Sequence, residues 1–225
     1  MLSRLQTIIS MIRSDPLNGI LYLLCFTAAI LVSLILHEIA HGYVAYRCGD
    51  PTAKMMGRLS LNPAKHLDPV GTVCMVIFGI GWAKPVPVNP RNYRHYRRDD
   101  ILVSVAGIVM NLILFLLTTA LVVAIQRHVT YSTFMYYIYL FLYLMSSLNL
   151  SLALFNLLPI PPLDGYHLLN DIIFRGRIQM TRQQFQIMQF VLIAICLTGV
   201  LSNLLSAVHT AIFNWAVQLM YTILP

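Results

Sequence analysis

The run NGILYLLCFTAAILVSLILHEIAH at residues 18–41 sets the membrane character of the chain. Residues 18–36 carry no charge, and about 20 such apolar residues in a helix cross the hydrocarbon core of a bilayer. We therefore predict a first membrane span that begins near residue 18 and ends near His41. The composition agrees, because 58% of the 225 residues are hydrophobic and only 10% are charged, against about 25% in an average soluble domain.

Three further apolar stretches follow. Residues 101–126 predict a second span, and residues 134–158 predict a third, which the prolines just beyond it end. Residues 183–225 contain no charge, enough for one long tilted span or two shorter ones. The predicted fold class is an all-α polytopic membrane protein. It forms a single domain over residues 1–225, with a three-span core at about residues 17–170 and one or two C-terminal spans.

The stretch between the first two predicted spans has a different character. Residues 69–83 are apolar but too few to cross a bilayer as a helix, and they contain three glycines. They lead into Lys84-Pro-Val-Pro-Val-Asn89, in which valine alternates with proline. This pattern favours an extended chain, which membrane depth tolerates only where protein or a cavity surrounds it. We predict a re-entrant hairpin or loop, with an ordinary surface loop as the alternative.

The positive charges predict the orientation in the bilayer. Of the 15 Lys and Arg residues, nine lie between residues 47 and 98. If residues 69–83 do not cross, segments 42–100 and 159–182 share one side, which the positive-inside rule makes cytoplasmic. The net charge of +7 then faces anionic lipid headgroups of the bilayer. We expect no nucleic-acid partner, because these bases flank long spans and lack any recognition motif.

A metal-binding pattern stands at the cytoplasmic end of the first span, in His37-Glu38-Ile39-Ala40-His41. Histidines four residues apart share one helix face and can bind one Zn²⁺, while the intervening glutamate reaches a metal-bound water as general base. The alternative is a polar helix end with coincidental histidines. Ionisable residues at a membrane span are costly and mark functional sites, which favours the metal.

Catalytic zinc keeps three protein ligands and one open position. Elimination narrows the choice of residue for the third ligand. Glu38 is the only glutamate in the chain, so a downstream glutamate cannot serve. The metzincin extension needs glycine and histidine where this chain has Val44 and Arg47. The remaining candidates for the third ligand are an aspartate or another histidine.

Topology selects Asp164 as that ligand. It follows the third span on the same side as the histidine pair. His167, three residues later, is a candidate either to hydrogen-bond a ligand from outside or to replace Asp164 as the ligand. Asp15 lies at the wrong end of the first span. The other candidate acids lie among bases in predicted loops, where we expect them to be solvated: Asp50, Asp68, Asp99 and Asp100.

Three motifs together resemble the site-2 protease family of intramembrane zinc metalloproteases, peptidase family M50. They are the His37–His41 pattern, a G-x-x-x-N formed by Gly107 and Asn111, and N-x-x-P-x-P-x-L-D-G over residues 156–165. The resemblance covers about residues 20–170 and is to a minimal form without a PDZ or CBS domain. It implies one Zn²⁺ held by the two histidines and Asp164, with Glu38 as general base.

The resemblance also implies a class of substrate and a location in the cell. The substrate would be a transmembrane protein, cut in or beside a membrane segment, in a prokaryotic cell membrane with the active site toward the cytoplasm. Residues 81–90 look like the membrane-embedded hairpin of the family. An unwound substrate could pair with it by strand addition, which makes Lys84, Val86, Val88 and Asn89 the candidate substrate-binding residues.

Two amides are candidate donors to the developing oxyanion, Asn156 first and Asn111 second. The alternative for each is a helix-packing amide. Two rival functions remain: a metal transporter, and an inactive scaffold of the same fold. A transporter explains the histidines but not the glutamate between them, and a scaffold does not need an intact base and ligand set.

Overall fold

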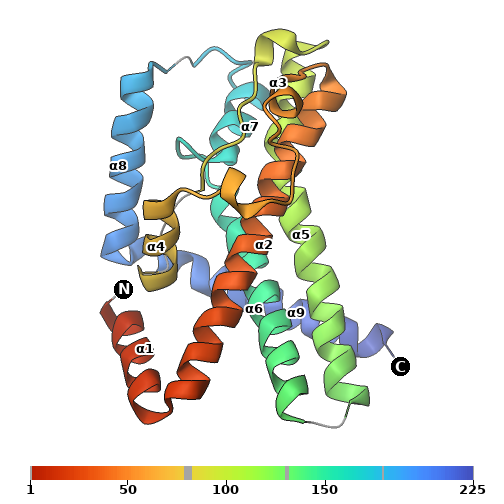
Figure 1. Ribbon diagram of the computed structural model, residues 1–225. Helices are drawn as coiled ribbons and strands as arrows, with labels where there is room; N and C mark the ends of the chain where they lie inside the picture. The colour runs from red at the N-terminus through yellow and green to blue at the C-terminus, as the bar shows by residue number, and fades with distance from the viewer. Residues whose placement is uncertain (1, 79–82, 130–131, 179, 225) are drawn as a thin grey trace.

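The computed structural model describes residues 2–78, 83–129, 132–178 and 180–224, and helices make up its architecture (Figure 1). The α-helices are α1 (Leu2–Ser14), α2 (Pro16–Cys48), α3 (Thr52–Met55), α4 (Pro69–Phe78), α5 (Tyr96–His128), α6 (Thr133–Asn156), α7 (Asp164–Ile172), α8 (Arg182–Thr198) and α9 (Val200–Ile223). Single 3-10 turns lie at Pro63–Lys65 and Pro90–Asn92. Within the described ranges there is no strand, only an isolated antiparallel bridge between Leu67 and Ala83. The predicted all-α class is confirmed.

Four helices are long and apolar enough to cross a membrane: α2, α5, α6 and α9. The first two predicted core spans lie within α2 and α5, which extend further into polar sequence. The third, predicted at residues 134–158, matches α6 except that the helix ends two residues earlier, at Asn156. Helix α2 continues past His41 to Cys48, where Gly49 adopts a left-handed φ of 113° and ends it. The helical hydrogen bonds do not stop where the apolar run stops, so hydropathy alone places this end too early.

The C-terminal stretch forms two helices. Gly199, with φ of 77°, separates α8 from α9. Of these two helices only α9 has the length and apolarity of a membrane span, whereas residues 183–198 of α8 form a shorter apolar helix. The stretch is therefore divided into two helices, of which one is a candidate span, rather than one long span or two spans.

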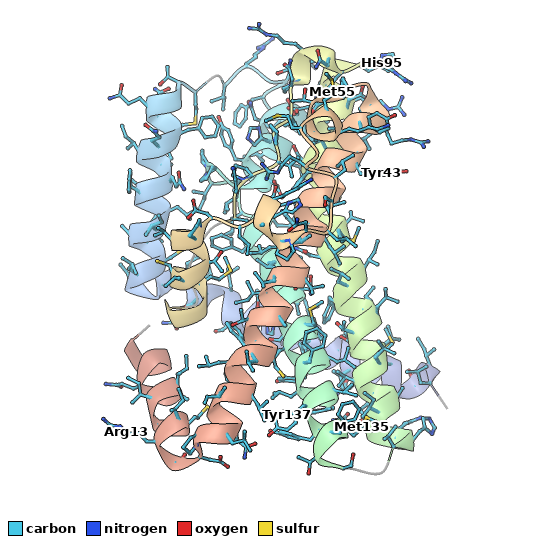
Figure 2. All side chains as sticks on the ribbon, viewed as in Figure 1. Arg13, Tyr43, Met55, His95, Met135 and Tyr137 are labelled. Carbon is cyan, nitrogen blue, oxygen red and sulfur yellow. The ribbon has the colours of Figure 1, made fainter. Side chains whose placement is uncertain are left out.

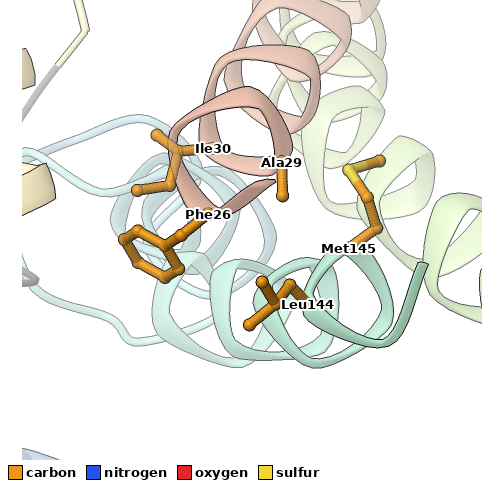
Figure 3. Packing of buried hydrophobic residues seen from close by; sticks show 5 residues of the cluster. All are labelled: Phe26, Ala29, Ile30, Leu144 and Met145. Carbon is orange, nitrogen blue, oxygen red and sulfur yellow. The ribbon is translucent and has the colours of Figure 1, made fainter. Parts of the chain in front are cut away.

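Helices α2, α5 and α6 pack together as the centre of the protein (Figure 1). Figure 3 shows one contact, in which Phe26, Ala29 and Ile30 of α2 meet Leu144 and Met145 of α6. Ala29 is fully buried, and its small side chain lets the two backbones approach.

Polar side chains add directional contacts to this apolar core. Asn149 Nδ2 of α6 donates to Ser33 Oγ of α2 over 2.9 Å. The hydroxyl oxygens of Thr119 and Ser146 lie 2.6 Å apart between α5 and α6. Such bonds between membrane helices fix their rotation more than they add stability.

Two elements differ from the sequence prediction. Helix α1 was not anticipated; it packs against α2, where a Cβ on Gly19 would lie 2.9 Å from Cγ1 of Ile12. The stretch at residues 69–83, predicted as a re-entrant hairpin or loop, begins with a helix that was not anticipated, α4. Residues 79–82 of that prediction lie outside the described residues. The chain from Ala83 to Asn89 is extended without forming a strand.

The alternating directions of the core helices bring distant residues to one end of the molecule. Figure 2 shows Met55 and His95 at one end, and Arg13, Met135 and Tyr137 at the other. Helices α2 and α6 run toward the first end and α5 runs away from it (Figure 1). The end of α2, the start of α5 and the start of α7 therefore meet there.

Candidate metal centre

Three side chains from two helices converge near the end of α2. Nε2 of His37 and Nε2 of His41 lie 3.0 Å apart. Oδ2 of Asp164, the first residue of α7, lies 3.4 Å from the former and 3.2 Å from the latter. Among the described residues this is the one group of three or more His, Cys, Asp or Glu side chains that could hold a metal ion. The structure thus brings the predicted ligand set together.

The turn before α7 aims Asp164 at the histidines. Helix α6 ends at Asn156, and the chain reverses through a proline-rich turn into α7. A Cβ on Gly165 would lie 2.4 Å from the backbone oxygen of Leu157. Only glycine lets the start of α7 lie this close to the end of α6, which explains the glycine after the aspartate.

Gly107 allows α5 to approach the metal site closely. A Cβ added there would lie 2.3 Å from Nε2 of His41 and 2.4 Å from Cε1 of His37. Gly107 therefore permits a close approach of α5 to α2. The atoms that it approaches are the candidate ligands themselves, so any larger residue would displace them.

Outer hydrogen bonds orient each imidazole. Nδ1 of His41 donates to the backbone oxygen of Val103 over 2.7 Å, leaving Nε2 as the free electron-pair donor. Nδ1 of His37 lies 3.1 Å from Nδ2 of Asn111, whose buried Oδ1 has no hydrogen-bond partner. A half-turn of the Asn111 amide, which preserves its shape, lets Oδ1 accept the Nδ1 proton that a metal-binding His37 carries.

The unpaired atoms and the carboxylate chemistry fit a bound cation. Oδ2 of Asp164 is buried near both Nε2 atoms without a hydrogen bond. Burial opposes the ionisation of Asp164, but its interactions with His37 and His41 outweigh burial and hold its pKa below the ordinary value. A carboxylate and two imidazole nitrogens facing one another form a donor set that zinc accepts.

Glu38 lies between the two histidines in sequence and contacts the extended segment 83–89. Its Oε2 accepts a hydrogen bond from the Val86 N–H over 2.7 Å. Val86 is 7% exposed and Val88 is 37% exposed. The catalytic base of the sequence prediction is therefore linked directly to a predicted substrate-binding residue.

The same segment is fixed at both ends. The Lys84 N–H donates to the His66 oxygen over 2.8 Å, and the Lys84 oxygen accepts from Nη2 of Arg58 over 2.6 Å. At the other end the Asn89 N–H donates to Oδ2 of Asp50 over 2.7 Å. One extended strip therefore lies along the end of α2 and contains Lys84, Val86, Val88 and Asn89. The role of these residues in substrate binding stays a prediction.

The expectation that Asp50 and Asp99 are solvated is wrong. Asp50 is fully buried and accepts hydrogen bonds from Thr52, Asn89 and Asn92. Burial opposes its ionisation, yet these donors hold its pKa below the ordinary value. Asp99 is 4% exposed and accepts from the His95 N–H. Asp50 is satisfied partly by donors distant in sequence, Asn89 and Asn92, whereas Asp99 accepts from the backbone of the nearby His95. A count of nearby charges reveals neither kind of donor.

The two candidate oxyanion donors occupy different places. Nδ2 of Asn156 donates to the Leu152 oxygen of its own helix over 3.0 Å. Asn111 contacts Nδ1 of His37, the ring nitrogen on the side opposite to Nε2. This contact supports a positioning role for Asn111. An oxyanion role for either amide stays a prediction, and Asn156 would have to leave its helix carbonyl first.

His167 and His66 lie outside the ligand cluster. The His167 ring stacks on Phe185 of α8 at 6.0 Å, and burial lowers its pKa. His66 is fully buried, with Nε2 2.7 Å from the Ser60 oxygen. It orders the loop before α4.

Asp171 is a residue that the sequence analysis missed. It lies on α7 two turns after Asp164 and is 2% exposed. Burial and the neighbouring Asp100 raise its pKa to about 7. Nε of Arg97 donates to the Asp171 backbone oxygen over 2.7 Å, tying the start of α5 to the end of α7. The seven-residue spacing from Asp164 on an amphipathic helix is the signal that could have found it.

Comparison with known proteins agrees with this geometry. Residues 25–199 match peptidase family M50. The chain is 45% identical over 175 residues to the Bacillus subtilis (strain 168) protein named "Putative zinc metalloprotease YwhC", covering 75% of this chain and 77% of that protein. It is 32% identical over 158 residues to "Putative zinc metalloprotease Rip2" of Mycolicibacterium smegmatis, covering 67% and 58% respectively. No solved structure matches. The chain therefore belongs to peptidase family M50, the family of the site-2 proteases.

Proposed function

We propose that this multi-pass membrane protein is an intramembrane protease, which hydrolyses a peptide bond in or near a transmembrane segment of another membrane protein. The observation that carries the proposal is the convergence of His37, His41 and Asp164 beside Glu38, at the end of an apolar membrane helix. Family membership and the relatives' names imply zinc as the metal.

The depth of the site supports a cut near one membrane boundary. His37 is 21 residues after Pro16 in α2, or about 30 Å along the helix axis at 1.5 Å per residue. This distance is close to the thickness of the hydrocarbon core. Water can therefore reach the site from one face while a membrane segment reaches it from the side.

The roles of the side chains follow from their chemistry. Zinc held by His37, His41 and Asp164 would supply a Lewis acid that activates water. Glu38 would act as the general base and pass the proton to the leaving amine. Val103 and Asn111 hold the two imidazoles in the orientation that presents Nε2.

The substrate must present an extended backbone. Hydrogen bonds within a helix shield its carbonyls, so a helical segment has to unwind before water can attack. The extended strip at residues 83–89 offers backbone groups that replace the lost hydrogen bonds. A transmembrane substrate with weak helical residues near the boundary, such as glycine or proline, satisfies this requirement.

The decisive experiment pairs cleavage with metal content. Purified wild type and Glu38→Gln are reconstituted with a panel of single-span peptides carrying glycine or proline at successive depths, and products are identified by mass spectrometry. We expect cleavage by wild type only, with about one zinc per chain in both proteins. Peptide binding without cleavage by a zinc-loaded wild type would favour the scaffold. Zinc flux across vesicles that depends on His37 and His41 would favour the transporter.

We further propose that the active site faces the cytoplasm. The basic residues around α3 and the start of α5 support this orientation. Met55 is 81% exposed, and Phe134, the neighbour of Met135 in the sequence, is 73% exposed. Figure 2 shows Met55 and Met135 at opposite ends of the molecule. In a cysteine-free background, Met55→Cys should resist an impermeant thiol reagent in intact cells while Phe134→Cys reacts. The reverse labelling pattern would invert the topology.

A further inference from the structure

The hydrogen bond between Glu38 and Val86 joins the proposed catalytic base to the strip that the substrate would contact. At 2.7 Å it is a short bond to an acceptor that is charged when ionised, the kind that exceeds a neutral hydrogen bond in strength. No other hydrogen bond of the Glu38 carboxylate is found among the described residues. This single contact therefore determines where the carboxylate rests.

The sequence of the strip leaves few backbone donors. Pro85 and Pro87 have no N–H, so Val86 supplies the one amide donor between Lys84 and Val88. Alternate residues of an extended chain present their backbone groups to the same edge. The edge of Pro85 and Pro87 therefore offers acceptors but no donors.

A paired peptide needs donors and acceptors in alternation along one edge. On this strip only the edge of Val86 and Val88 provides them, and no hydrogen bond of the Val88 N–H is found within the described ranges. The Val86 N–H, however, is held by Glu38. A backbone that pairs with this edge must compete with the carboxylate for that donor.

Hydrogen bonds hold both ends of the strip in place, so the Glu38 carboxylate is the group that has to move. Arg58 and Asp50 hold the two ends through the bonds described above. Val86 packs on α2 where Gly42 leaves room, since a Cβ on Gly42 would lie 2.9 Å from Cγ1 of Val86. Glu38 has a flexible side chain with one hydrogen bond among the described residues, so its displacement breaks that bond only.

We infer that a carbonyl of the substrate backbone takes over the Val86 N–H from Glu38, so that strand pairing releases the base toward the water of the metal site. The inference rests on the proposed protease function. In the resting protein the base is held against the strip, and a correctly paired substrate frees it. Val86 is a positioning residue that acts through its backbone amide, and it couples substrate docking to proton transfer.

The unique glutamate provides a direct probe of this exchange. Because Glu38 is the only glutamate, cell-free synthesis with glutamate labelled with ¹³C at the side-chain carboxyl carbon places one labelled carboxylate in the protein. Its infrared stretching band reports the hydrogen bonding of that group at fixed pH. Without any peptide, the zinc-loaded Val86→Pro variant, which lacks the donor, should show a shifted band. The Val88→Pro variant, which keeps the donor, should show the wild-type band.

The second arm adds a substrate analogue. A transmembrane peptide that wild type cleaves is made with its scissile amide replaced by a ketomethylene group, which cannot be hydrolysed. Binding of this peptide should shift the wild-type band to the position seen in Val86→Pro, and should leave the Val86→Pro band unchanged. For the cleavable peptide, Val86→Pro should raise KM by about 5- to 10-fold, the effect of one hydrogen bond, with kcat retained within about two-fold.

The outcomes separate this inference from the proposed function. A wild-type band that stays in place while the analogue binds overturns the exchange and leaves the protease function standing. Equal bands in wild type and Val86→Pro without peptide overturn the resting contact. A loss of kcat and zinc together in Val86→Pro assigns Val86 a merely structural role. Absence of cleavage of any peptide, with a shifted Val86→Pro band, contradicts the proposed function but preserves the contact.

Discussion

Gly107 and His41, on different helices, approach so closely that one added carbon on Gly107 would lie 2.3 Å from Nε2 of His41. The backbone of α5 thus forms one wall of the metal site. We predict that Gly107→Ala lowers zinc occupancy by at least about ten-fold, because the imidazoles must rotate away from the positions that ligation needs. Zinc per chain after dialysis measures this directly.

The control for Gly107→Ala is Ala106→Gly on the same turn. That change costs α5 about 1 kcal/mol of helix stability but adds no atom near the histidines. It should retain full zinc. Equal zinc content in Gly107→Ala and wild type would mean that the ligands do not depend on this wall.

Asn111 should control metal affinity through His37. Asn111→Leu removes the partner of the His37 Nδ1 proton, and loss of such an outer hydrogen bond weakens metal binding by about 10- to 100-fold. Competition with a zinc chelator of known affinity measures the change. Asn149→Leu is the matched control, since Asn149 is also a buried amide but bonds Ser33 in the core; it should leave zinc affinity unchanged.

The third ligand is tested by metal content alone. Asp164→Ala should reduce zinc from about one per chain to a small fraction, because two imidazoles without the carboxylate make an incomplete site. His167→Ala should keep the wild-type content, since His167 stacks on Phe185 outside the ligand cluster. Zinc loss in His167→Ala with retention in Asp164→Ala would move the third ligand to His167.

Asp171 should make stability depend on pH. Its pKa in the folded protein is about 7, above about 3.9 for an unfolded aspartate. Between these values the folded state holds a proton that the unfolded chain has released, so the destabilisation by this group grows as pH rises from about 4 to 7 and is constant above that. The charged groups facing Asp171 are Asp100, His167 and Arg97.

Asp171→Asn removes this pH-dependent destabilisation and leaves the backbone contact with Arg97 in place. We expect its melting temperature in detergent to exceed that of wild type by a few degrees at pH 8, since about 1 kcal/mol corresponds to 2–4 °C in a protein of this size. The difference should shrink toward pH 5. A melting-temperature difference that is constant over pH 5–8 would contradict the raised pKa.

The sequence sufficed for features that depend on neighbours along the chain. The core spans follow from uncharged runs, and the His37–His41 pair follows from helical spacing. Asp164 follows from topology, since one side of the membrane carries both the end of the first span and the end of the third. The aspartate needed no knowledge of α7 itself.

Features that depend on distant partners could not be predicted in this way. Asp50 looked solvated because nearby bases in sequence outnumber it, whereas its actual partners include Asn89 and Asn92, about 40 residues away. Helix α4 was not predicted because its stretch is too short to cross a bilayer, contains glycines and leads into the Val/Pro segment. Chain position alone did not reveal that Asn111 turns to His37 or that Val86 holds Glu38.

The prolines at positions 85 and 87 have a protective effect as well. An extended chain with free amide donors is a template for aggregation. Because the edge of Pro85 and Pro87 lacks amide donors, it cannot start a continuous sheet with a second extended chain or with another copy of itself. Under the proposed strand pairing, only the edge of Val86 and Val88 would bind a substrate chain.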